Sequence, residues 1–268
     1  MSYAPLPKCY KKMFPFRLAT TSYVYPDHMI PNVAMLSPFF DEIELVLFES
    51  ESQDNLLDDV QIKALMNFHL HQDVAFNIHL PIDISLGDKS EVIRSKGASV
   101  VKRRIERTLP LNPSIYTLHL ERRNKNGREE PDIETWRRRI RQSMEEIVRC
   151  EMGSNRISIE TLEYPFEWVE DIVKEFGLSI CLDIGHILIH EQDLRSYLEK
   201  YLTNTSIIHL HGFQDSVDHL GIDRLSESAL EMIFSHLRDY HGIVSLEVFS
   251  IDDLKRSLTT LEEKWGRE

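Results

Sequence analysis

The segment Cys181-Leu-Asp-Ile-Gly-His186 decides how this chain is interpreted. It contains the end of an apolar run, Leu178-Ser-Ile-Cys-Leu182, which is typical of a buried β-strand. Asp183 and His186 therefore lie where a strand runs into a loop. A carboxylate and an imidazole so placed can both reach one divalent cation, because the strand fixes the first ligand and the turn brings the second back over the strand end. We predict that both bind metal.

The same pattern recurs along the chain, where short apolar runs repeatedly end in histidine or glutamate. The residues at these ends are His79, His119, Glu160 and Glu163, His209 and His211, and Glu247. His209 and His211 are two residues apart, so on a strand their side chains point to the same face. Parallel strands that close into a barrel present all their carboxyl ends at one mouth. We therefore expect one metal-binding mouth built from many strand ends.

Strand and helix signals alternate over most of the sequence. The expected strands cover residues 17–23, 43–48, 74–79, 115–119, 157–160, 178–182, 206–210 and 244–247. Stretches with helical periodicity cover residues 58–71, 91–108, 131–150, 166–176, 192–202, 226–240 and 251–265. This alternation predicts a parallel sheet, and eight strands favour a closed (β/α)8 TIM barrel. We expect one domain over residues 1–268, with an irregular N-terminal tail at 1–14. No glycine-rich phosphate loop follows any expected strand, which disfavours nucleotide-binding folds.

Composition limits the class of partner. The net charge of −13 makes nucleic acid an unfavourable partner, since proteins that bind duplex phosphates usually carry a basic stripe. No apolar run is long enough to cross a bilayer, and residues 1–8 contain no apolar signal core. The three cysteines are widely spaced and form no CxxC motif, which fits free thiols in a reducing cytosol. We expect a cytoplasmic protein with a small-molecule substrate and no membrane or nucleic-acid partner.

Each candidate ligand also has a purely structural interpretation. A single histidine at a strand end is more often a hydrogen-bonded structural residue than a metal ligand. Asp183 can cap the helix that follows it, and Glu163 can do the same. The case for a metal site therefore rests on the recurrence of such residues at successive strand ends.

Over nearly the whole chain, the order of these residues resembles the xylose-isomerase-like superfamily (AP endonuclease family 2). The motifs that carry the resemblance are Asn77-Ile-His-Leu-Pro81, Cys181-Leu-Asp-Ile-Gly-His186 and Ser245-Leu-Glu247. The resemblance implies a site for up to three divalent ions of manganese, iron, zinc or cobalt. It implies that His79, His119 and Glu160 serve one side of the site. Its other implied ligands are Asp183, His186 and His209 on the opposite side, with Glu160 and Glu247 as bridges.

The sequence departs from the endonucleases of that superfamily in the loop after the seventh strand. Those enzymes carry Asp-x-His, whereas here Asp218 and His219 are adjacent and Val217 stands two residues before His219. This difference puts a third, endonuclease-type metal in doubt. Together with the acidic net charge, it weakens an abasic-DNA interpretation.

Within the superfamily, the chain is similar to the cobamide-remodelling phosphodiesterases. The similarity rests on residues 16–26, 30–32, 43–49 and 246–250, on His209-Leu-His-Gly212, and above all on Glu160-Thr-Leu-Glu-Tyr-Pro-Phe-Glu-Trp168. These enzymes hydrolyse the nucleotide-loop phosphodiester of corrinoids such as cobalamin. The implied products are cobinamide and the riboside phosphate of the lower ligand.

The expected roles follow from the residue types and this resemblance. The expected catalytic residues are Glu247, Glu160 and His219, and the expected substrate-binding residues are Arg17, Tyr23, Glu163, Trp168, His211, Phe213 and Asp218. An aromatic wall against a flat macrocycle is expected from Tyr23, Tyr25, Tyr164, Phe166, Trp168 and Phe213. Two alternatives remain open. One is a sugar or sugar-phosphate isomerase, many of which carry a strand-end lysine that is missing from the expected strands here. The other is a non-catalytic corrinoid or metal carrier.

Overall fold

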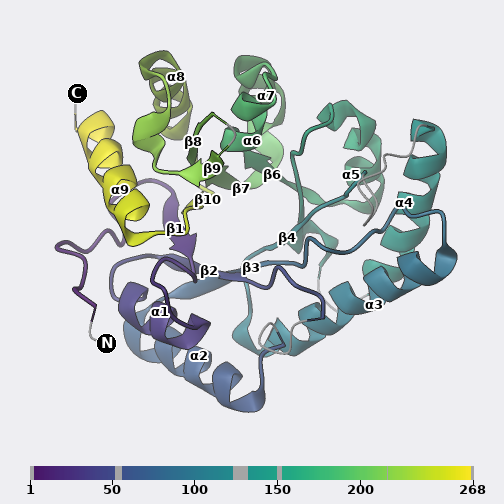
Figure 1. Cartoon of the computed structure of the whole chain (residues 1–268), viewed down its shortest axis with the longest axis horizontal. Helices are drawn as coiled ribbons and strands as arrows, with labels where there is room; N and C mark the ends of the chain where they lie inside the picture. The colour runs from purple at the N-terminus through teal and green to yellow at the C-terminus, as the bar shows by residue number, and fades with distance from the viewer. Residues whose placement is uncertain (1–2, 52–55, 123–131, 150–152, 216, 267–268) are drawn as a thin grey trace.

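The strands form one closed parallel barrel in a computed structural model that describes residues 3–51, 56–122, 132–149, 153–215 and 217–266 (Figure 1). Around the barrel the strands follow the order β1-β10-β7-β6-β5-β4-β3-β2, and every neighbouring pair is parallel. Their bounds are β1 Arg17–Thr21, β2 Glu42–Val46, β3 Ala75–His79, β4 Tyr116–Leu118, β5 Ile157–Glu160, β6 Ser179–Asp183, β7 Thr205–Leu210 and β10 Ile243–Leu246. The predicted (β/α)8 architecture is confirmed.

Helices surround the barrel, as Figure 1 shows. Their bounds are α1 Met29–Leu36, α2 Asp59–Gln72, α3 Glu91–Thr108, α4 Ile133–Ile147, α5 Glu170–Phe176, α6 Ile184–Ile189, α7 Leu194–Tyr201, α8 Glu227–Leu237 and α9 Ile251–Trp265. Helix α4 illustrates why they pack outside: Trp136, Ile140, Met144 and Ile147 recur every three or four residues and are buried. That spacing places them on one stripe against the barrel and leaves the arginines between them on the other faces.

Three elements were not expected from the sequence. Helix α1 lies in a stretch to which we assigned neither helix nor strand, and the six-residue helix α6 lies where we expected a loop. The third is an antiparallel hairpin of β8 (Gly212–Gln214) and β9 (Val217–Leu220), which follows β7. Helix α6 begins directly after β6, so His186 lies in a first helical turn and not in an open loop.

The interior of the barrel is unusually polar. A small apolar layer there consists of Ala19, Ile115, Cys181, Ile207 and Ile243. Hydrogen-bonding side chains fill much of the remaining interior: Glu42, Glu44, Asn77, Thr117, Ser158, Ser179 and Ser245 are all buried. Buried polar groups are costly unless they are paired, so this interior requires a network of partners.

At the chain's beginning, residues 3–16 contain neither a helix nor a strand. Phe14 and Phe16 nevertheless pack edge-on against Trp265 of α9, with ring centroids 5.3 and 5.6 Å from the indole. Among the helices of the described residues, none is long and apolar enough to span a membrane.

Candidate metal centre

The carboxyl ends of the barrel strands bring six predicted ligands together. His79, Glu160 and Asp183 are the last residues of β3, β5 and β6, and His209 lies near the end of β7. His119 follows β4 by one residue and Glu247 follows β10 directly. Each of these side chains is buried, with 0 to 9% of its residue surface exposed. Because side chains alternate along a strand, only this register turns all of them into the barrel.

One group of ligands comprises His79, His119 and Glu160. The Nε2 atoms of His79 and His119 lie 3.2 and 2.9 Å from Oε2 of Glu160. The opposite ring nitrogens are also held: Nδ1 of His79 is 3.0 Å from the Leu80 carbonyl oxygen, and Nδ1 of His119 is 3.0 Å from Oε1 of Glu121. Carbonyl and carboxylate oxygens only accept hydrogen bonds, so each Nδ1 carries the ring proton. Each Nε2 faces a carboxylate oxygen of Glu160, a contact that needs a proton or a cation between the two atoms.

A second group comprises Glu160, Asp183, His209 and Glu247. Nδ1 of His209 lies 3.1 Å from Oε2 of Glu247, 3.6 Å from Oε2 of Glu160 and 3.9 Å from Oδ2 of Asp183. On the other side of the same ring, Nε2 is 3.0 Å from Oε1 of Glu44. Glu160 therefore belongs to both groups and joins them.

The buried carboxylates and imidazoles of these groups shift one another's pKa values. Burial alone would raise the pKa of Glu160, but the charges of His119 and His209 hold it well below its usual range. Burial opposes protonation of His119, yet Glu160 and Glu121 raise the pKa of its imidazole to about 10. In a metal-free protein, protons on the imidazoles therefore balance the buried carboxylates.

The residues present fit divalent metal ions. Two acceptors 2.9 to 3.2 Å apart repel unless a cation or a proton lies with them, and three imidazoles here face carboxylates in this way. Among the described side chains, Nε2 of His119, Nδ1 of His209 and Oε2 of Glu247 are buried without a hydrogen bond of normal geometry. Mixed imidazole and carboxylate shells suit zinc, manganese and ferrous iron. The two groups that share Glu160 are therefore candidate sites for two neighbouring ions.

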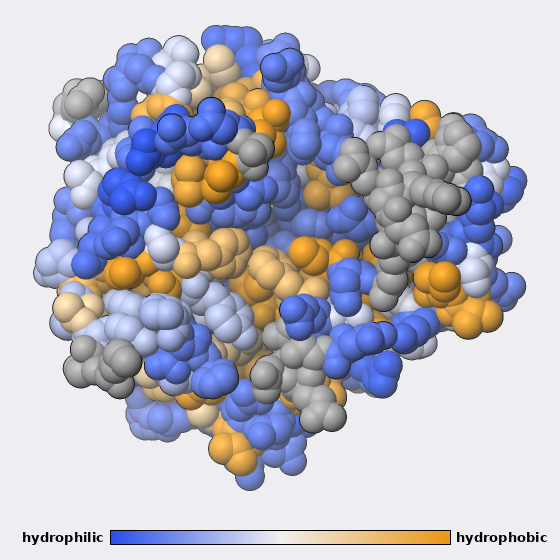
Figure 2. Space-filling view, in the orientation of Figure 1, coloured by the Kyte–Doolittle hydropathy of each residue, from blue (hydrophilic) through white to orange (hydrophobic). Residues whose placement is uncertain are grey.

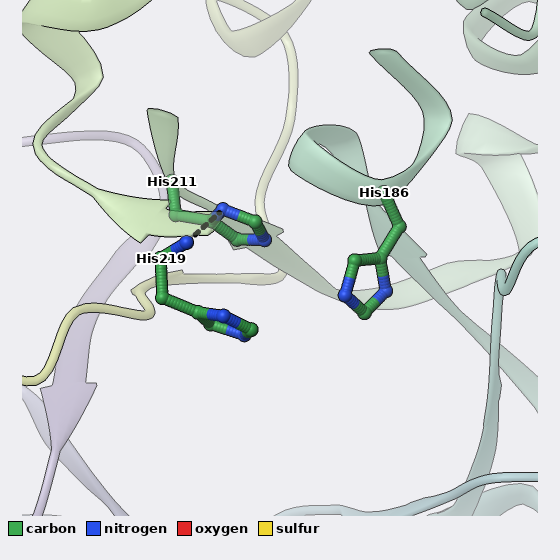
Figure 3. Close-up of side chains that lie close together, drawn as sticks. All are labelled: His186, His211 and His219. Carbon is green, nitrogen blue, oxygen red and sulfur yellow. Dashed lines mark hydrogen bonds between the residues drawn. The ribbon is translucent and has the colours of Figure 1, made fainter. Parts of the chain in front are cut away.

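Three more histidines lie close to one another beside these groups: His186, His211 and His219 (Figure 3). Nδ1 of His186 is 3.3 Å from Oδ2 of Asp183 and 3.4 Å from Oε1 of Glu160, so His186 borders both groups. His219 lies on β9, with Nδ1 3.0 Å from Oδ1 of Asp218 and Nε2 3.6 Å from Oε2 of Glu247. Asp218 thus contacts His219 directly, and burial is outweighed by the nearby carboxylates, which raise the pKa of His219 to about 10.

The structure does not bring Arg17 to this mouth, which corrects its expected role in substrate binding. Arg17 is the first residue of β1 and lies at the amino end of the barrel, where its guanidinium pairs with Glu42 at the start of β2. The strand separates it from the metal ligands. His211 is also corrected as a substrate contact, because its residue surface is fully buried behind Asp183.

The expected aromatic wall is only partly present. Tyr25, Tyr164 and Phe166 are core residues with 1 to 4% of their surface exposed. The partly buried members of the set are Tyr23, Trp168 and Phe213, and Glu163 in the loop after β5 is partly buried as well. Trp168 stacks on Tyr164 with centroids 5.8 Å apart, and the Arg122 guanidinium lies 5.0 Å from the Trp168 ring.

Sequence reasoning missed Glu44, which lies in the middle of β2 and is fully buried. Besides its contact with His209, it accepts a 2.5 Å hydrogen bond from the Ser245 hydroxyl. A signal was present, because a glutamate two residues from another glutamate inside a short apolar strand is unusual for a strand buried on both faces.

Comparison with known proteins identifies the family. The model of the xylose isomerase-like TIM barrel matches residues 40–266, which is most of the chain. The chain belongs to this family. Among curated proteins, none matches it.

Several solved structures share the fold at low sequence identity. A D-tagatose 3-epimerase-like protein is 20% identical, with 94% of this chain and 97% of that chain covered and a TM-score of 0.74. Endonuclease IV from Thermus thermophilus is 16% identical, with 92% and 99% covered and a TM-score of 0.68. The IOLI protein with a binding zinc atom is 12% identical, with 93% and 98% covered and a TM-score of 0.69. These similarities establish the fold, which serves epimerases and an endonuclease alike.

Proposed function

We propose that the protein is a divalent-metal-dependent phosphodiesterase that hydrolyses the nucleotide-loop phosphodiester of cobamides to cobinamide and a riboside phosphate. The observation that carries the metal chemistry is the shared Glu160, which joins the His79–His119 group to the Asp183–His209–Glu247 group. Two adjacent ions, when bound, supply positive charge for the phosphodiester oxygens and lower the pKa of water. The similarity of the sequence to cobamide-remodelling enzymes supplies the substrate class.

The chain's own residues account for the remaining requirements of hydrolysis. His219 lies at the opening, with 21% of its side chain exposed and its Nε2 directed to Glu247. This position at the opening places His219 to donate a proton to a leaving oxygen. Glu247 lies between His209 and His219 and is the carboxylate we assign to orient the attacking water.

Apolar side chains at the mouth support a large substrate with an apolar face. Phe48 is half-buried, and its ring lies 4.8 Å from the His79 ring and 5.8 Å from the Phe249 ring. Phe249 in turn lies 5.2 Å from His219 and is 36% exposed. Figure 2 shows a hollow in the middle of the molecule, with hydrophilic residues inside it and hydrophobic residues along its border. Exposed apolar surface beside a polar site is typical of a binding site for a ligand of mixed polarity.

A second candidate is a metal-dependent sugar or sugar-phosphate isomerase or epimerase. The observation that favours it is the group of Glu160, Asp183, His209 and Glu247, which forms a complete one-ion site by itself. It places two carboxylates from different strands, Glu160 and Glu247, where they can remove and return a proton at a sugar carbon.

The test is anaerobic incubation of the protein with Mn²⁺, Fe²⁺, Zn²⁺ or Co²⁺ on cobalamin and pseudocobalamin, followed by mass analysis. Parallel reactions contain ketohexoses, sugar phosphates or abasic DNA. His186→Ala is the matched control, because His186 borders both ligand groups. We expect cobinamide and a riboside phosphate from the wild type and neither from the variant. Turnover of a sugar with no corrinoid product would contradict the phosphodiesterase proposal and support the isomerase or epimerase.

A further inference from the structure

One contact sets His211 apart from the candidate metal ligands: its Nδ1 accepts a hydrogen bond from the backbone N–H of His219. It lies one residue after β7 with its surface fully buried. Its Nε2 lies 3.1 Å from Oδ1 and 3.3 Å from Oδ2 of Asp183. Its Nδ1 lies 3.1 Å from the backbone nitrogen of His219, the contact drawn as a dashed line in Figure 3, and 3.1 Å from the Gly212 carbonyl oxygen.

These contacts determine where the ring proton lies. The His219 backbone N–H can only donate, so Nδ1 of His211 accepts this hydrogen bond, and the Gly212 carbonyl oxygen near Nδ1 receives none from the ring. Nε2 faces the Asp183 carboxylate, which can only accept, so Nε2 carries the ring proton and donates a hydrogen bond to Asp183. With both nitrogens engaged, His211 offers no lone pair to a metal ion. The three neighbouring histidines of Figure 3 are thus not a three-imidazole metal site in this arrangement.

Asp183 and His219, the two hydrogen-bond partners of His211, are both under structural constraint. Asp183 is a candidate metal ligand whose Oδ1 also accepts a 2.7 Å hydrogen bond from the His186 backbone, which caps α6. His219 has a backbone φ of +54°, in the left-handed region that non-glycine residues rarely occupy. Such a conformation costs free energy and persists where surrounding contacts enforce it. The hydrogen bond to His211 is one such contact, and the two rings stack with centroids 4.3 Å apart.

The chain also leaves room for the His211 ring. A Cβ atom at Gly185 would lie 2.1 to 2.4 Å from the ring's Cε1, Nδ1 and Nε2 atoms. Any side chain at position 185 would therefore displace the ring from Asp183. The glycine in the Asp-Ile-Gly-His segment is explained by this close approach, because its own φ is not in the positive range.

We propose that His211 is a positioning residue that fixes the Asp183 carboxylate through its Nε2 proton and fixes the His219 backbone through its Nδ1 lone pair. It thereby couples one candidate metal ligand to the β8–β9 hairpin that carries His219 over the mouth. This inference rests on metal binding at the mouth and is independent of the reaction proposed above.

Two near-isosteric substitutions separate the two contacts. In His211→Asn, the amide oxygen occupies the place of Nδ1 and can accept from His219, but nothing reaches Asp183. In His211→Gln, the terminal amide reaches the place of Nε2 and can donate to Asp183, while the acceptor for His219 is removed. For each variant we would measure the affinity for Co²⁺ alone and, on the metal-free protein, the hydrogen exchange of the His219 amide. Thermal midpoints of the metal-free proteins would establish that both variants fold.

Each variant is expected to lose one of the two properties, Co²⁺ affinity or protection of the His219 amide, and to keep the other. His211→Asn should lose about 10- to 100-fold in Co²⁺ affinity, as is usual when a group that orients a metal ligand is removed. Its His219 amide should stay protected. His211→Gln should keep Co²⁺ affinity within about threefold, while its His219 amide exchanges about tenfold faster, the loss expected for one hydrogen bond. If both variants bind Co²⁺ like the wild type, or lose affinity and amide protection to the same degree, His211 is only a packing residue and the proposal is overturned.

Discussion

Glu42 and Glu44 lie two residues apart on β2, and both are fully buried inside the barrel, but their surroundings differ. Glu42, at the amino end, pairs with Arg17 and accepts hydrogen bonds from Asn77 at 3.1 Å and Ser114 at 2.7 Å. Glu44, nearer the mouth, has one hydroxyl donor and faces the imidazole of His209. The protein pairs Glu42 with the guanidinium of its own Arg17. Glu44 instead lies beside His209, a candidate ligand for a metal ion. A buried acidic residue therefore indicates function only where its partners are incomplete.

The largest effect on activity is expected when the carboxylate that joins the two ligand groups is removed. In Glu160→Gln we expect activity to fall by about 10³-fold, since bound metal contributes several kcal/mol to catalysis and each 1.36 kcal/mol is tenfold in rate. Bound metal per chain should fall as well, as measured by elemental analysis after dialysis. The matched control is Glu42→Gln at the other end.

The Glu42→Gln control should affect stability and leave metal content unchanged. The amide cannot pair with Arg17 as a carboxylate does, so we expect a loss of about 1–3 kcal/mol in the free energy of unfolding, measured by chemical denaturation. Equal losses of bound metal in both variants would show that the two ends do not differ in the way we describe.

A narrower test concerns the carboxylate that sequence reasoning missed. Glu44→Gln removes a buried negative charge 3.0 Å from Nε2 of His209, the nitrogen that faces away from the other ligands. We expect metal affinity to fall about 10- to 100-fold, because acidic partners of ligating histidines raise their basicity and fix their orientation. Competition with a chromophoric chelator measures this. Unchanged affinity would mean that Glu44 only supports the barrel interior.

The dependence of metal binding on pH follows from the raised pKa values. Burial opposes protonation of these imidazoles, but neighbouring carboxylates raise the pKa of His119 to about 10 and of His186 to about 9. At pH 7.5 the metal-free protein therefore holds protons that a metal ion must displace. Affinity should rise with pH until these groups have lost their protons, above about pH 10, and at least one proton should be released per ion. Calorimetry in two buffers of different protonation enthalpy measures the number of protons released per ion. Binding without proton release would contradict the protonation we assign to the metal-free site.

The smallest effect is expected at the apolar border of the mouth. The Phe249 ring lies beside the rings of Phe48 and His219 and belongs to neither of the two candidate ligand groups. In Phe249→Ser we expect a rise in KM of about 10-fold for a corrinoid, the value of one partly buried aromatic contact, with little change in kcat. Steady-state kinetics separates these terms. A loss confined to kcat would place Phe249 in the chemistry and not in substrate binding.

The barrel and the meeting of most candidate ligands at its mouth were predictable because one geometric rule produces both. Parallel strands separated by helices end at the same face, so His79, Glu160 and Asp183 at strand ends had to meet. The predicted ranges 91–108 and 251–265 coincide with α3 and α9, where helical periodicity is long and uninterrupted.

Other features of the site were not predicted, and several of them depend on contacts between residues that are distant in the sequence. Arg17 was expected to bind substrate from its residue type and the resemblance, although it begins its strand and chain direction puts it at the amino end of the barrel. Helix α6 has only six residues, too few for a visible period, and Asp183 both ends β6 and caps this helix. The role of His211 depends on contacts with Asp183 and His219, which lie 28 and 8 residues away in the chain. The aromatic wall was wrong where the rings of Tyr25 and Phe166 turned into the core.

The absent side chain at Gly185 has a consequence for how this sequence can vary. Because the His211 ring occupies the space where a Cβ would stand, position 185 cannot gain a side chain while this ring keeps its place. A chain of this type that carries alanine or a larger residue at position 185 must carry a smaller side chain at 211 and anchor its aspartate in another way. Paired substitution at these two positions is therefore a marker, readable from sequence alone, for members of the family that arrange this edge of the metal centre differently.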